Sequence, residues 1–164
     1  MARWMALDVG EARIGVAISD ATGFLASPYT TLHVTRDESL TWKAIQRLIS
    51  ETETEGLVIG LPISLDGAIH SQAKQVQAFA EHLKEHITIP LTFWDERLST
   101  VEAERLMVER GEAEHGGHYK ATGGRRRNQS KRRRRKQEVD SLAAAIILQE
   151  YLDHQMSKTR GTDL

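Results

Sequence analysis

The sequence of 164 residues contains no cysteine. This absence excludes disulfides, thiolate zinc sites and cysteine nucleophiles. The sequence also has no apolar run close to the roughly 18 residues that a membrane helix needs. Its N-terminus carries one arginine and a short apolar stretch, too little for a signal peptide. We therefore expect a soluble, cytoplasmic protein with no membrane partner.

Several common catalytic signatures are missing as well. The spacing of Gly10 and Gly15 fits neither a dinucleotide fingerprint nor a Walker loop, because no Gly-Lys-Ser/Thr follows. There is also no nucleophile elbow of the serine hydrolases. The length suits one domain with a sizeable core. We expect that domain over residues 1–155, followed by a disordered tail at 156–164.

The net charge of −1 conceals a strong asymmetry. Nine of the twelve residues from 125 to 136 are lysine or arginine, and the rest of the chain holds 13 basic against 23 acidic residues. A run of like charges without apolar positions predicts a mobile basic loop, which we place at about 111–136. A solvated loop would be the simpler interpretation, but contact with nucleic acid is favoured. The residues expected to bind it are Arg125, Arg126, Arg127, Lys131, Arg132, Arg133, Arg134, Arg135 and Lys136.

The apolar pattern predicts an α/β fold. Strands are expected at 3–8, 14–19, 29–34, 56–60 and 87–94, and helices at 38–50, 71–86, 99–110 and 137–154. Tight connections near the N-terminus predict an antiparallel meander of three strands, whereas the later helical crossovers predict parallel strands. The result is a mixed five-stranded sheet flanked by helices.

Acidic residues stand at the ends of several predicted elements. Asp8 closes the first apolar strand, where a carboxylate is costly unless it is paired or binds a cation. Asp95 and Glu96 follow a later strand, at the carboxyl edge where open α/β sheets place their sites. Asp140 lies in the first turn of the last helix, where it could also be only a favourable charge at a helix N-terminus.

Three converging carboxylates would need a cation. Oxygen ligands without cysteine favour Mg²⁺ or Mn²⁺. Two such ions about 4 Å apart can activate water and stabilise the leaving oxygen in phosphodiester hydrolysis. Strand alternation points Asp95 and Glu96 to opposite faces, so one or the other would join Asp8 and Asp140. Arg13 and Arg97 could contact substrate phosphates or form structural ion pairs.

Four motifs together resemble a known family. They are Leu7-Asp8-Val9-Gly10 with Arg13-Ile14-Gly15-Val16-Ala17 and Asp20; Val58-Ile59-Gly60-Leu61-Pro62 with Asp66-Gly67; Asp95-Glu96-Arg97-Leu98-Ser99-Thr100 with Glu102-Ala103; and Asp140 with Ala143-Ala144-Ile147-Leu148. In this order they resemble the YqgF/RuvX family of pre-16S rRNA nucleases, within the RNase H-like superfamily that includes the RuvC resolvases. The basic segment is longer and more basic than the resemblance leads us to expect.

The resemblance implies an RNase H-like fold and a catalytic and metal-binding set of Asp8, Asp140 and either Glu96 or Asp95. The function it implies is metal-dependent processing of the 5′ end of pre-16S rRNA in ribosome biogenesis, with precursor rRNA or the pre-ribosomal particle as partner. Two alternatives are a RuvC-like nuclease on branched DNA and a non-catalytic nucleic-acid-binding protein.

Overall fold

The computed structural model describes residues 2–63, 70–95 and 125–161, without the side chains of residues 125–129 and 133. Five strands form one mixed sheet in the order β3-β2-β1-β4-β5. The first three strands are antiparallel, and β4 and β5 run parallel to β1. This arrangement confirms the predicted sheet. The strands are β1 (Trp4–Val9), β2 (Arg13–Ser19), β3 (Ala26–His33), β4 (Gly56–Leu61) and β5 (Leu91–Asp95).

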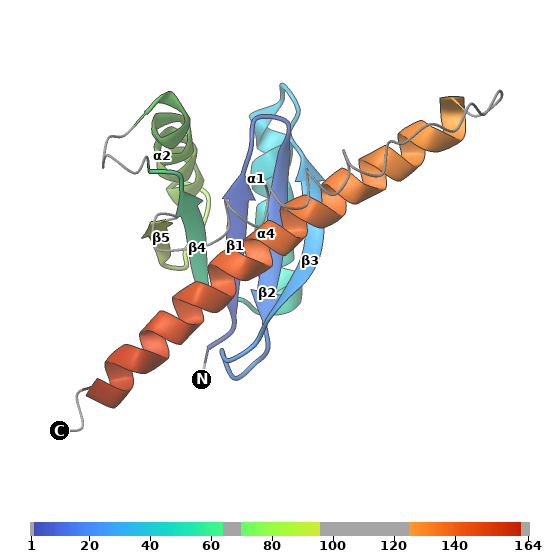
Figure 1. Ribbon diagram of the computed structural model, residues 1–164. Coiled ribbons are helices and arrows are strands. Elements are labelled where there is room, and N and C mark those ends of the chain that lie inside the picture. The colour runs from blue at the N-terminus through green and yellow to red at the C-terminus, as the bar shows by residue number, and fades with distance from the viewer. Residues whose placement is uncertain (1, 64–69, 96–124, 162–164) are drawn as a thin grey trace.

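Helices cover both faces of this sheet (Figure 1). Helices α1 (Glu38–Thr52) and α2 (Ser71–Lys84) lie on one face, and the long helix α4 (Arg125–Gly161) crosses the other diagonally. Since successive strand residues point to opposite faces, each strand serves both layers. In β1, Leu7 packs with the α1 and α2 side, whereas Ala6 packs with α4.

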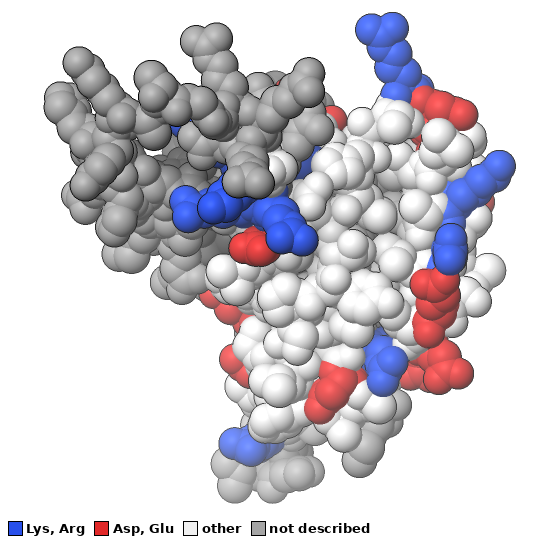
Figure 2. Space-filling model, turned by 90° about the vertical axis from the view of Figure 1, so that its right-hand side faces the viewer, with Lys and Arg blue, Asp and Glu red and all other residues white. Residues whose placement is uncertain are grey.

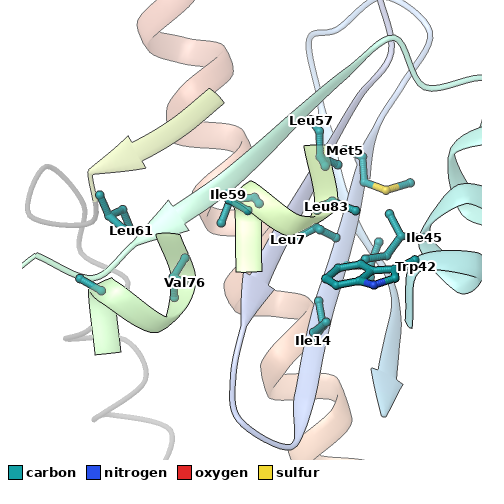
Figure 3. Packing of buried hydrophobic residues seen from close by; sticks show 13 residues of the cluster. Met5, Leu7, Ile14, Trp42, Ile45, Leu57, Ile59, Leu61, Val76 and Leu83 are labelled. Atoms are coloured by element: carbon teal, nitrogen blue, oxygen red, sulfur yellow. The ribbon is translucent and has the colours of Figure 1, made fainter. Parts of the chain in front are cut away.

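The two cores differ in the size of their side chains. Large apolar residues fill the α1 and α2 side, where Trp42 and Ile45 of α1 lie beside Leu7 and Ile14 of the sheet (Figure 3). On the other side, the sheet presents the small residues Ala6 and Ala17 to α4. Small side chains let the backbone of a helix approach a sheet closely, and this approach sets the position of Asp140, which lies inside α4.

The basic segment departs from expectation. We predicted a loop at 111–136, but residues 125–136 form the first third of α4, so the prediction of a loop there is wrong. Arginine and lysine are good helix formers. The apolar part of the helix is held on the sheet, so the basic segment only extends an existing helix and does not have to nucleate one. The remainder of the predicted loop, residues 111–124, lies outside the described residues.

The C-terminal tail also departs from expectation. We predicted disorder from residue 156, whereas α4 continues to Gly161. Helix extension again explains the difference, because each added residue gains a backbone hydrogen bond once a helix exists. The helix has 37 residues in all.

Helix α4 is long, but it carries many charged side chains. No helix in the described part of the chain is long and apolar enough to cross a membrane.

Candidate active site

Asp8 lies near the carboxyl edge of the sheet. It is the fifth residue of β1, half-buried, and its partner across the antiparallel ladder is Gly15 of β2. Because Ala6 packs against α4 and Leu7 against the opposite layer, alternation puts Asp8 on the α4 face. The structure thus places this acid under the long helix, at the edge where β1, β4 and β5 all end.

Gly15 brings Asp140 to the same place. A Cβ atom at Gly15 would overlap the backbone carbonyl of Asp140, so only glycine permits this contact between β2 and α4. Directly paired residues in an antiparallel ladder have Cβ positions about 5 Å apart. Asp8 therefore lies beside the point where Asp140 rests on the sheet. Gly15 belongs to one of the sequence motifs, but its role as the contact for α4 was not predicted, although a glycine inside a strand often marks close backbone approach.

Arg13 holds the Asp140 carboxylate. Its Nε donates a hydrogen bond to Asp140 Oδ2 at 2.6 Å, and the two side chains are 33% and 24% exposed. Partial burial shields this ion pair from solvent more than a surface pair would be shielded. Of the two roles considered for Arg13, the structural ion pair is present.

Asp95 is the last residue of β5 and pairs with Leu61 of β4. Trp94 packs with α4, while Leu61 and Phe93 belong to the opposite layer. Alternation therefore places Asp95 on the face away from Asp8. Glu96, the other candidate for the third carboxylate, lies outside the described residues, as does Arg97.

The donor set fits a hard divalent cation in its chemistry. Asp8 and Asp140 offer carboxylate oxygens at one edge of one sheet face, which suits Mg²⁺ or Mn²⁺. Within residues 2–63, 70–95 and 125–161, no three histidine or acidic side chains gather closely enough to hold a metal ion. A complete site would need a ligand from elsewhere in the chain, and Glu96 is the predicted one.

Basic side chains gather at the start of α4. The exposed ones are Lys131, Arg132, Arg134, Arg135 and Lys136. The helix carries this basic arm, residues 125–136, past β3 at the edge of the sheet (Figure 1). Figure 2 shows a group of basic side chains on this side of the molecule. Since Asp140 follows Lys136 by about one helical turn, the arm leads directly to the acidic edge.

A cavity of about 430 Å³ lies where the paired ends of β2 and β3 meet α4. Its described lining residues are Ala12, Arg13, His33 and Gln137. His33 and Gln137 were not among the residues predicted from the sequence. His33 ends an exposed edge strand and Gln137 stands between two charged residues, so neither carries a local signal of a site.

These observations define a class of protein: an RNase H-like α/β protein with acids at the carboxyl edge of a mixed sheet. The same fold occurs in Thermus thermophilus RuvC in complex with a Holliday junction substrate, with a TM-score of 0.53, 12% identity, and coverage of 96% of this chain and 97% of that one. A second Thermus thermophilus RuvC structure gives a TM-score of 0.51 at 11% identity, covering 94% and 96% of the two chains.

The sequence comparisons define the family. Residues 2–122 match the RuvX family model, described as "Holliday junction resolvase". A protein of Thermoanaerobacter pseudethanolicus is 39% identical over 95% of this chain and 99% of its own length, and one of Roseiflexus sp. is 43% identical over 93% and 95%. Both are named "Putative pre-16S rRNA nuclease". The chain belongs to the RuvX family. These two curated relatives are named nucleases, that is, hydrolases of phosphodiester bonds.

Proposed function

We propose that this protein is a divalent-metal-dependent nuclease that processes the 5′ end of pre-16S rRNA, as a cytoplasmic step of ribosome biogenesis. The observation that carries the proposal is the placement of Asp8 and Asp140 on one sheet face, joined through the contact of Gly15 with α4. The names of the curated relatives support precursor rRNA as the substrate.

The chain's own residues have distinct roles in this proposal. Asp8, Asp140 and Glu96 would hold the cation, and Arg13 would orient the Asp140 carboxylate by its hydrogen bond. Asp95 lies on the other face of the sheet and is the less suitable third ligand. When bound, a divalent ion lowers the pKa of water and stabilises the charge that develops on the leaving oxygen.

The basic arm would supply affinity for the substrate. The rest of the chain carries more acidic than basic residues, so it repels a polyanion. Lysine and arginine on the arm would offset this repulsion by neutralising backbone phosphates. Phosphate contacts position a nucleic acid without reading its sequence. The arm would therefore bind the strand and position it at the carboxylates that hold the cation.

A cleavage assay on precursor 16S rRNA with Mg²⁺ or Mn²⁺ tests the proposal. Wild type should cut near the mature 5′ end, and Asp8→Asn should abolish cutting while still binding RNA. Glu138→Gln is the matched control, since Glu138 is an exposed acid two residues before Asp140, and it should cut like wild type. Cleavage by Asp8→Asn at the wild-type rate would refute the assigned site.

Branched DNA is the second candidate substrate, because the family model carries the description "Holliday junction resolvase". Cleavage of a four-way junction and of precursor rRNA should be compared at one salt concentration, since affinity for nucleic acid depends steeply on salt. Faster cutting of the junction would favour DNA. Binding of both substrates without metal-stimulated cutting of either would favour a non-catalytic binding protein.

A further inference from the structure

The cavity beside Arg13 has a polar wall built from three elements. Arg13 begins β2 and His33 ends β3, and these two residues pair across the ladder. Gln137 of α4 closes the other side, with its Nε2 2.8 Å from His33 Nε2. The Thr31 hydroxyl also donates to the Gln137 carbonyl at 2.7 Å. The wall is therefore fixed by contacts between the sheet and the helix.

The position of the cavity links the two parts of the proposed site. Gln137 directly follows the basic arm and precedes Asp140 by three residues, which is about 4.5 Å along a helix axis. Arg13 belongs to both places, because it lines the cavity and its Nε binds Asp140. A strand running from the arm to the acids would cross this cavity immediately before the acids.

We propose that this cavity is a subsite for one unpaired nucleotide of the RNA strand, next to the phosphate that is cut. The inference rests on the proposed nuclease function. A volume of about 430 Å³ lies in the usual range of about 300–1,000 Å³ for small-ligand pockets. This volume is enough for a single nucleotide.

The chemistry of the wall matches an unpaired nucleotide. Single-stranded RNA is recognised by stacking of splayed bases on aromatic or guanidinium groups, and by hydrogen bonds to base edges. The exposed imidazole of His33 and the guanidinium of Arg13 offer stacking faces, and the Gln137 amide offers donors and an acceptor. The substrate class that follows is RNA with a single-stranded segment at the cleavage site.

Binding measurements without divalent ions test the subsite separately from catalysis. Fluorescence anisotropy would compare a short single-stranded RNA with a blunt RNA duplex of the same sequence. Wild type should prefer the single strand. Gln137→Glu and His33→Ala should each weaken single-strand binding about fivefold or more and leave duplex binding within twofold. The control is Gln155→Glu, the same charge change at an exposed position of α4, which should alter neither affinity.

Two results would overturn the subsite. One is single-strand affinity within twofold of wild type in both variants; the other is an equal loss for single strand and duplex. If these variants fail to fold, carbethoxylation of histidines in the wild-type protein, mapped by mass spectrometry, tests the same subsite. Single-stranded RNA should lower the carbethoxylation of His33 but not that of His86, which stacks on Trp42 on the opposite layer. An equal effect of RNA on the two histidines would also contradict the proposal. The nuclease function is tested only by the cleavage assay, and the subsite only by these binding and protection measurements. Either proposal can therefore fail while the other stands.

Discussion

Arg13 Nε lies 2.6 Å from Asp140 Oδ2, and this hydrogen bond joins residues 127 positions apart in the sequence. It ties the start of β2 to the long helix at the point where Gly15 lets the helix touch the sheet. A guanidinium in this position fixes the direction of a carboxylate and neutralises part of its charge. The pair therefore connects the fold to the proposed metal chemistry.

Replacing Arg13 should weaken metal binding. If Arg13 orients Asp140 as an outer partner of a ligand, Arg13→Gln should raise the Kd for Mn²⁺ about 10- to 100-fold, measured by calorimetry without RNA. The control is Arg47→Gln, which breaks the Arg47–Glu51 pair on the surface of α1 and should leave the Kd unchanged. Tighter binding of Mn²⁺ by Arg13→Gln would instead mean that Arg13 competes with the ion.

A side chain at Gly15 should force α4 away from the sheet. The Cβ atom of Gly15→Ala would overlap the Asp140 carbonyl, and such overpacking typically costs about 1–3 kcal/mol. Thermal unfolding should show a lower Tm, and cleavage should fall because Asp140 moves relative to Asp8. Gly161→Ala is the control, since a Cβ there meets nothing within 4 Å. An unchanged Tm for Gly15→Ala would contradict the close contact.

Neutralising two arginines of the basic arm should reduce the salt dependence of RNA binding. If Arg134 and Arg135 each contact one phosphate, changing both to glutamine should reduce the slope of log Kd against log salt by about 1.4. The double variant Lys158→Gln with Arg160→Gln removes the same charge from the other end of α4. It should leave the slope as in wild type, and equal changes in both would mean that only net charge matters.

The third carboxylate should be identifiable by paired substitutions. Asp95 lies on the sheet face opposite Asp8, so Asp95→Asn should retain most cleavage activity. Glu96→Gln should remove it, since Glu96 is the remaining candidate. Initial rates on precursor rRNA at saturating Mg²⁺ measure both effects. The reverse order of the two activities would assign the role to Asp95.

Asp20 should make stability depend on pH. Hydrogen bonds from the Phe24 amide, the Thr22 hydroxyl and the Leu25 amide hold the pKa of Asp20 below its ordinary 3.8. A folded-state pKa below the unfolded one stabilises the fold above the unfolded pKa, and this contribution is lost as the pH falls through the folded pKa. Asp20→Asn should therefore be less stable than wild type at pH 7, and the gap should close toward pH 2. Urea unfolding at both pH values measures the difference in free energy of unfolding between the two proteins. A difference that does not change with pH would exclude the charge of Asp20 as its cause.

Local pattern was sufficient for most of the sheet. Alternating apolar residues, tight turns and helical crossovers predicted five strands and their directions, because strand periodicity and connection length are properties of short segments. Boundaries shifted where local signals conflict. The strand predicted from residue 87 begins at Leu91, directly after Pro90, which has no amide hydrogen for a sheet ladder.

The basic segment shows where local reasoning failed. Repulsion among nine charges predicted a loop, yet residues 125–136 are helical. The helical conformation of the segment is decided by residues outside it. Apolar residues of α4 that pack on β1 and β2, such as Ala144 and Ile147, hold the helix from which the arm extends. Charge density alone cannot predict such propagation.

The sequence by itself determined the mixed sheet, the acids Asp8 and Asp95 near the ends of its strands and the family to which the chain belongs, since each is written in local order and residue type. It did not place Asp140, which was expected in the first turn of the last helix but lies inside α4. Only the tertiary structure decided that Arg13 binds Asp140, that Gly15 seats α4, that Asp95 faces away from Asp8, and that His33 and Gln137 share a cavity. These relationships join residues far apart in the chain, and they depend on how closely a helix packs on a sheet, which side-chain volume and register set together.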